Sequence, residues 1–500
     1  MPPFGKSQKT AALTRREAVI SISIATAALP IISLSSNAEE FESQQALSLP
    51  TGSPSNEHLI AGIDPKNLVD QYTSRKLDKV SDGGLYRQAV AIISRPQAKC
   101  TKSFTLHAPL ELMARFGLLS YVDPTQRSLA RLQMVASASA YESGVQVATA
   151  PSKVNPFPSL ASAKTEFTNA FRAADADGLE ALVLQIAAQF GTASLVQLLT
   201  PLALPTLTGA SHSHIGLWLL IRHARAGDSG DASLLRAAVR RIAADPSAQL
   251  SSFSGMAISG SKPLDRSPTL IEQDILNKLS RPSRGERSGG NLRALLEAGE
   301  QTGNADTLFG EFIRHDLNHG QMDAAFRAVM RVCAHSMLQD RQSQSKFGWS
   351  HCLTLPQAAC GLSSLNIDRK LALAATLVWI TSYRSVLSKK DLDFSWTPPK
   401  PSPELTFQDA LNESPEVAGA KVWHAKPEEI PNIVQTLATQ ASIRNDQHLV
   451  KYTRACFDMG SFDPSFRQLY LASAAHLCAL WISETPQDGI LDNLLMGRET

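Results

Sequence analysis

Apolar residues recur at spacings of three and four along most of the chain, the pattern of helices that bury one face. In residues 104–121, for example, Leu106, Leu110, Met113 and Leu118 fall on one side. The alternating pattern of a β-strand is almost absent. Further helices are predicted over residues 124–144, 161–174, 178–190, 193–204, 213–226, 232–244, 268–279, 293–300, 306–315, 322–338, 353–365, 370–387, 427–440, 446–457 and 464–481. We therefore expect an all-α protein, a large array of stacked antiparallel helices that is irregularly solenoid-like.

Breaks in this pattern suggest how the chain is divided. Residues 247–290 are rich in Ser, Gly and Pro, and residues 391–404 contain four prolines, which cannot continue a helix. We expect an N-terminal helical half over residues 58–246, a linker over 247–290 and a C-terminal helical half over 291–500. A polar tether over residues 39–57 is expected to precede them.

The first 38 residues have the layout of a secretory signal peptide. Four basic residues precede a run of apolar and small residues, which is short for a spanning helix and ends in Ser36-Asn37-Ala38. Arg15-Arg16 resembles a twin-arginine signal, although Ala18 stands where an aromatic residue is usual. The alternative is an uncleaved amphipathic or membrane-anchoring start. We expect an exported, periplasmic protein with no stable membrane insertion once the signal is removed.

Composition narrows the classes of function. The chain has 500 residues, of which 43% are hydrophobic and 19% charged, so it can bury a large core. A net charge of +2 argues against a nucleic-acid partner. Six widely spaced cysteines without a C-x-x-C pair make no disulfide framework. No dinucleotide-binding fingerprint, P-loop, H-E-x-x-H or G-x-S-x-G motif is present.

The histidines are the most informative polar residues. Several of the twelve lie in apolar helical segments, where an imidazole needs a partner. Neutral imidazole is a good ligand for Fe, Cu or Zn and a good acid–base near neutral pH. We expect helices of both halves to bring His107, His214, His351 and His448 to one buried pocket as the catalytic residues. A metal site of His107, His214, His351 and His319 is the corresponding prediction. The alternative is that each histidine caps a helix or bonds one backbone carbonyl in the core.

Four histidine-centred segments together resemble the questin oxidase-like family. They are residues 106–112 (LHAPLEL), 209–217 (GASHSHIGL), 350–358 (SHCLTLPQA) and 448–456 (HLVKYTRAC), the last followed by Asp463-Pro464. The resemblance implies an NADPH-dependent, oxygen-using oxidoreductase with Baeyer–Villiger-like chemistry on an aromatic polyketide-type molecule. It supplies no catalytic residues of its own.

The sequence therefore predicts an oxidoreductase that acts on a hydrophobic small molecule through a histidine-lined pocket between helices. In that reading the histidines ligate a metal or shuttle protons, with His448 or His319 as the fourth contributor. One rival is a non-catalytic helical scaffold that binds a peptide or protein on a concave face. Another is a helical carrier of a small ligand. Histidines that meet at one place favour the enzyme, and dispersed histidines favour the scaffold.

Overall fold

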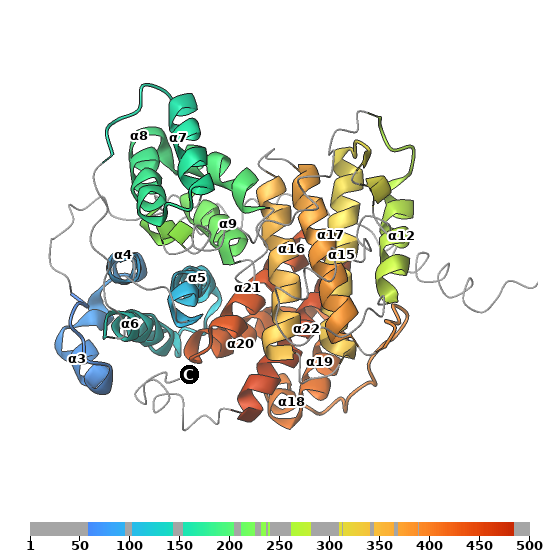
Figure 1. Ribbon diagram of the computed structural model, residues 1–500. Helices are drawn as coiled ribbons and strands as arrows, with labels where there is room; N and C mark the ends of the chain where they lie inside the picture. The colour runs from blue at the N-terminus through green and yellow to red at the C-terminus, as the bar shows by residue number, and fades with distance from the viewer. Residues whose placement is uncertain are drawn as a thin grey trace, which may run out of the picture. The chain divides into compact units, whose positions relative to one another are not determined.

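The computed structural model describes residues 59–95, 103–143, 154–204, 212–225, 232–236, 239–240, 262–281, 310–312, 314–340, 345–364, 369–388 and 390–484. Within these residues the chain is helical, and its only β-type pairing is an isolated bridge between Pro263 and Asp316 (Figure 1). The all-α prediction is confirmed. The irregular solenoid-like arrangement is not established by the contacts between these helices.

Three N-terminal helices pack against one another: α4 (Asp82–Ile93), α5 (Ser103–Leu118) and α6 (Arg127–Ser143). α7 (Leu160–Arg172) and α8 (Ala176–Ala203) follow as a packed pair. Asp175 begins α8, because its side chain accepts a hydrogen bond from the backbone N–H of Gly178. α9 (His212–Arg225) then packs against both α8 and α5.

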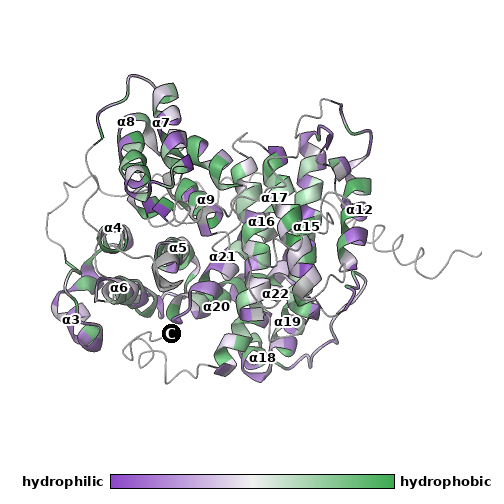
Figure 2. Ribbon diagram, in the orientation of Figure 1, coloured by the Kyte–Doolittle hydropathy of each residue, from purple (hydrophilic) through white to green (hydrophobic). Residues whose placement is uncertain are grey.

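The C-terminal helices enclose a central helix, α22 (Arg467–Glu484). Every residue of α22 from Leu469 to Leu480 is buried, as expected for a helix surrounded by others. The helices in this region that the structure describes are α15 (His319–Gln339), α16 (Ser350–Ser363), α17 (Arg369–Leu387), α18 (Phe407–Glu413), α19 (Pro415–Trp423), α20 (Ile430–Ile443) and α21 (Gln447–Phe462). Of these, α15 and α18–α21 contact α22 directly. Figure 2 shows hydrophobic residues along much of α15, α16 and α17.

Only some of the segments into which we divided the chain lie within the described residues. Part of the predicted linker forms α12 (Pro268–Ser280), which packs against α15. The proline-rich residues 391–404 contain no helix, as expected. The predicted signal peptide, the tether and the helix over 293–300 lie outside the described residues. The described cysteines are free and buried, and Cys100 lies outside the described residues.

α8 is the one described helix that is long and apolar enough to cross a membrane. Only 33% of its most apolar window is buried, and Gly191 interrupts it with φ 83° and ψ 159°, a conformation that only glycine adopts readily. One such helix is weak evidence for a membrane protein, so the absence of stable membrane insertion stays a prediction.

Four helices, α5, α9, α16 and α21, form a closed ring in which each helix packs against two of the others. α5 packs against α9 and α21, and α16 also packs against α9 and α21. Histidines near the starts of these helices contact one another, and a second set of contacts lies about two to three turns later in each helix. There Asp458 of α21 pairs with Arg222 of α9 and accepts a hydrogen bond from Gln357 of α16, and Arg454 donates to the carbonyl of Gly117 in α5. The four helices therefore run in the same general direction, and their N-terminal parts meet at one end.

Candidate functional site

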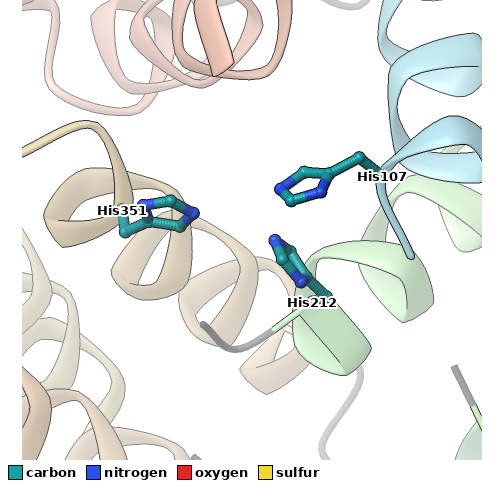
Figure 3. A group of neighbouring side chains, drawn as sticks. All are labelled: His107, His212 and His351. Carbon is teal, nitrogen blue, oxygen red and sulfur yellow. The ribbon is translucent and has the colours of Figure 1, made fainter. Parts of the chain in front are cut away.

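Three imidazoles meet at that end of the ring. His107 of α5, His212 of α9 and His351 of α16 point toward one another (Figure 3), and one ring nitrogen from each lies within 4.8 Å of the others. The ring centroids of His107 and His212 are 4.2 Å apart, and those of His212 and His351 are 5.8 Å apart. The three side chains come from three separate segments of the chain.

His448 of α21 adds a fourth imidazole. Its ring centroid lies 4.9 Å from that of His107 and 5.0 Å from that of His351. The carboxylate of Asp446 is 3.7 Å from Nδ1 of His448 and also caps α21 by accepting the N–H of Leu449. The histidine cluster is therefore His107, His212, His351 and His448, and each of the four residues is at most 7% exposed.

The histidines lie near the starts of their helices. His212 is the first residue of α9, and His448 and His351 are the second residues of α21 and α16. Side chains on a helix lean toward its N-terminus. Because the four helices run in the same general direction, this lean carries all four rings toward one point.

Hydrogen bonding leaves ring nitrogens available. Nδ1 of His351 donates to the carbonyl of Phe347 at 2.7 Å, so Nε2 of His351 carries the lone pair. Among the described residues, Nε2 of His351 and both ring nitrogens of His212 have no hydrogen-bond partner. Buried polar atoms are rarely left in this state, because losing water without a new partner costs about 1–3 kcal/mol. The lone pairs of these two rings are therefore available to a ligand.

Burial favours the uncharged form of three rings of the cluster. Loss of water around the rings holds the pKa of His212 and of His351 well below the usual 6.5, and the neighbouring histidines and Lys451 lower both further. Burial also lowers the pKa of His448, although Asp446 opposes this. Neutral imidazole is the form that binds a metal, so these rings need not lose protons at neutral pH.

A buried lysine and a buried ion pair lie beside the cluster. Lys451 follows His448 by one turn of α21, and burial lowers its pKa to about 7 against the opposing charges of Asp446 and Glu111. Glu111 follows His107 by one turn of α5 and forms a buried ion pair with Arg115 at 2.8 Å. Arg115 in turn donates to the carbonyls of Ser442 and Arg444 at the C-terminal end of α20.

Phe347 connects the cluster to the surface. It belongs to the π-helical turn Ser345–Trp349, a form of helix often found at functional sites. Phe347 is 62% exposed, yet its ring centroid lies 5.0 Å from that of His448. Its backbone carbonyl accepts the hydrogen bond from His351.

Two predicted site residues are not in the cluster. Nε2 of His214 donates to the carbonyl of Leu204 at 3.2 Å, so this ring serves the packing of α8 against α9. His319 is exposed at the start of α15, where it contacts Arg369. Neither is placed to join the metal site that the sequence suggested, whereas His107, His351 and His448 are brought together.

Sequence reasoning missed His212 and Lys451. Gly216 lies one turn after His212, and an added Cβ there would be 3.1 Å from Leu110 of α5, so this face of α9 approaches the helix of His107. The small residue one turn away was the available signal for His212. For Lys451 the signal was a charged residue inside the apolar run Leu449-Val450-Lys451-Tyr452.

The cluster fits a transition metal better than a dinucleotide. Zn–N bonds of 2.0–2.1 Å place tetrahedral ligand nitrogens about 3.3 Å apart, so the three nitrogens within 4.8 Å need only a modest approach. His107, His212 and His351 would hold the ion, with His448 as a fourth donor. The four rings offer neither a guanidinium nor backbone amides for the phosphates of NADPH.

Known proteins give no independent assignment of this site. The resemblance to the questin oxidase-like family stays a prediction. No family model matches the chain, and it matches no curated protein and no solved structure.

Proposed function

We propose that the protein is a metal-dependent, oxygen-using oxidoreductase that acts on a hydrophobic aromatic small molecule at the histidine cluster. The four imidazoles hold Fe, Cu or Zn. Iron or copper at this site would supply one-electron and oxygen chemistry, and zinc would supply a Lewis acid. The electron donor is a separate molecule, and NADPH is the donor that the resemblance implies.

One observation carries this proposal: four buried imidazoles from four helices meet at one place, where Nε2 of His351 and both ring nitrogens of His212 lack hydrogen-bond partners among the described residues. A histidine that serves only packing is expected to bond a neighbour, as His214 does with Leu204. An all-imidazole donor set suits Zn, Cu, Fe and Ni rather than Mg or Ca.

The apolar nature of the substrate is supported by Phe347. An exposed aromatic ring that also packs against His448 offers a hydrophobic molecule its first contact. Its carbonyl orients His351, so movement of this turn would also change the direction of that imidazole. The location belongs to the same proposal: an exported protein that works in the periplasm.

The test is metal analysis of the full-length protein, combined with an absorption spectrum. We expect about one equivalent of iron, copper or zinc in the wild type and a loss of that metal in His107→Ala, His212→Ala and His351→Ala. His214→Ala and His319→Ala are the matched controls and should retain it. Oxygen uptake with a panel of aromatic substrates then tests turnover in the same samples.

Folding is checked separately, because a buried alanine leaves a cavity. Added metal should raise the melting temperature of the wild type and of the two controls but not of the three cluster variants, since only a protein with the site gains stability from the metal. Metal retained by His351→Ala and His212→Ala would rule out the site. Metal without turnover on any substrate would favour the carrier or scaffold over the enzyme.

A further inference from the structure

We propose that Phe347 is a gate over the histidine cluster. Its ring covers His448 on the solvent side, and the turn that carries it, Ser345–Trp349, opens to admit a small molecule. The closed turn also sets the orientation of His351, so the site is complete only while the gate is shut. This inference rests on the proposed function for what the site does, and it adds how entry to that site is controlled.

Phe347 lies between the cluster and the solvent. Its ring meets that of His448 edge to face, with the two planes at 87°, and its centroid is 6.4 Å from that of Trp481 in the last turn of α22. Among the described residues, Phe347 is the one exposed residue whose ring contacts the cluster, and His448 itself is buried. A molecule that reaches His448 from this side must therefore displace the Phe347 ring.

Weak contacts hold the gate closed. A single edge contact between aromatic rings contributes little stability. The Nζ atom of Lys346 lies 3.8 Å from the ring centroid of Trp481 and pairs with Glu484, whose side chain is 53% exposed. An ion pair with an exposed partner is also weak, because water screens it. The turn can therefore open at a small cost in free energy, as a gate requires.

The turn has a free end and a fixed end. Phe347 is exposed, Trp349 is fully buried, and Gly348 stands between them. Glycine changes its backbone torsions at little cost, and small residues are common at the hinges of lids. Beyond Trp349, the indole N–H of Trp379 on α17 donates to the carbonyl of His351 at 3.3 Å and holds the backbone there. Movement is therefore expected in the turn and not in α16.

Opening the turn also changes His351. Its Nδ1 atom donates to the carbonyl of Phe347 at 2.7 Å, and the hydroxyl of Ser350 donates to the carbonyl of Lys346 at 2.5 Å. Two carbonyls of the turn are thus bound by the first two residues of α16. When the turn moves away, the His351 ring loses the partner that orients it. A closed gate and a correctly oriented His351 therefore belong to the same state.

Chemical modification of the metal-free, full-length chain tests the gate. A neutral imidazole attacks diethyl pyrocarbonate, an N–C bond forms, and carbon dioxide and ethanol leave, the latter with the imidazole proton. Peptide mass mapping gives the rate at each histidine, with exposed His319 as the reference. Phe347→Ala should speed modification of His448 about 3- to 10-fold, the factor expected for loss of one aromatic contact. Faster modification of buried His335 and His476 as well would mean a general loosening of the fold and no gate.

Metal exchange tests the link between the turn and His351. Phe347→Ala removes the ring but keeps the backbone carbonyl. Capture of Cu(II) and its removal by EDTA should therefore both become about 3- to 10-fold faster, while the Kd changes by less than about threefold. Lys346→Met loosens the turn itself. Its Kd should weaken by about two- to fivefold as well, because His351 is oriented in a smaller share of the molecules.

Three variants serve as controls. Phe466→Ala removes another exposed phenylalanine, whose ring packs against an arginine of α15. Lys370→Met removes a lysine whose side chain is 15% exposed, against 13% for Lys346, and which also pairs with an exposed carboxylate. Both should leave modification of His448 and exchange of copper as in the wild type. Phe347→Trp keeps a large ring over His448 and should keep its modification slow.

The outcomes separate this inference from the proposed function. If His448 in metal-free Phe347→Ala is modified at the wild-type rate, the gate is refuted, whether or not the cluster binds metal. If modification becomes faster as expected but no sample binds copper, the metal site is wrong and the gate stands. If Lys346→Met binds copper as tightly as the wild type, the link between the turn and His351 is refuted.

Discussion

Lys451 and His448 lie one turn apart on the same side of α21, and both are buried. An amine that is buried without a partner should weaken the fold. The amine loses its water but gains no partner among the described residues. The burial of this amine therefore works against the stability of the fold.

Replacing Lys451 with methionine should stabilise the metal-free protein. Burial lowers the pKa of Lys451 to about 7, from an ordinary value of 10.5. Below pH 7 Lys451 stays charged in the folded protein, and burying this charge costs roughly 3–5 kcal/mol of folding stability. Urea denaturation at pH 7 in the presence of a chelator should show Lys451→Met to be more stable by an amount of this order.

The difference in stability between the wild type and Lys451→Met should change with pH in a definite direction. Between pH 7 and 10.5 the unfolded state binds the proton that folded Lys451 has released, so the wild type gains stability relative to Lys451→Met as the pH rises. The advantage of the variant should shrink across this window. An advantage that stayed constant from pH 7 to pH 10 would mean that Lys451 is not buried as described.

Replacing Gly361 with alanine should weaken metal binding at the histidine cluster, although Gly361 is not part of that cluster. A Cβ at this position of α16 would lie 2.3–2.5 Å from atoms of the Trp218 ring on α9, so the two helices must separate. Overpacking of this kind costs about 1–3 kcal/mol. Because α9 carries His212 and α16 carries His351, calorimetric titration of Gly361→Ala with metal should show weaker binding as well.

Gly320 provides the matched glycine. It is exposed in α15, and a Cβ there would meet its nearest atoms at the ordinary distances of 3.6 and 3.7 Å. Gly320→Ala should therefore raise stability by about 0.4–1 kcal/mol and leave metal binding unchanged. Equal behaviour of the two variants would argue against close packing of α9 on α16.

Arg115 should be among the residues most important for stability. It pairs with buried Glu111 and donates to the carbonyls of Ser442 and Arg444. Arg115→Met leaves a buried carboxylate without its cation, and we expect a loss of about 3–5 kcal/mol in urea denaturation. Adding Glu111→Gln to this variant should recover part of the loss, and no recovery would mean that the backbone bonds of Arg115 outweigh the ion pair.

Acid should destabilise the protein through buried histidines outside the cluster. Burial lowers the pKa of His335 and of His476 to about 4. Between pH 6.5 and 4 the unfolded state binds protons that the folded state does not, so stability falls as the pH falls. His476→Asn should remove about 2–3 kcal/mol of this loss between pH 7.5 and 4.5, measured by urea denaturation. An unchanged pH slope would contradict the assignment.

Periodicity located most helices but not all their ends. The predicted helix over 213–226 is α9, His212–Arg225, and the predicted helix over 322–338 is the core of α15, His319–Gln339. α15 begins earlier because Asn318 and Gln321 form a capping box that adds a turn with few apolar residues. α3 (Leu68–Ser74), α4, α18 and α19 were not predicted. α18 and α19 are short, and a proline-rich stretch precedes them.

The sequence predicted a cluster of buried histidines, but it did not predict all the residues of that cluster. His107, His351 and His448 stood out because each interrupts an apolar helix face. His212 and His214 were harder to separate, because two residues turn a helix by about 200° and only one of them can face α5. Which faces of distant helices meet depends on packing over the whole chain, and a single sequence does not contain that information in readable form.

The ring of four helices has a consequence for the order of folding. Gly117 and Arg454, which join α5 to α21, are 337 residues apart in the chain. Contacts of such long sequence separation form slowly, since a long loop must close first. The histidine cluster is therefore completed only after both ends of the ring have been synthesised and docked. A ligand bound there would link four distant segments and would select chains that have finished folding.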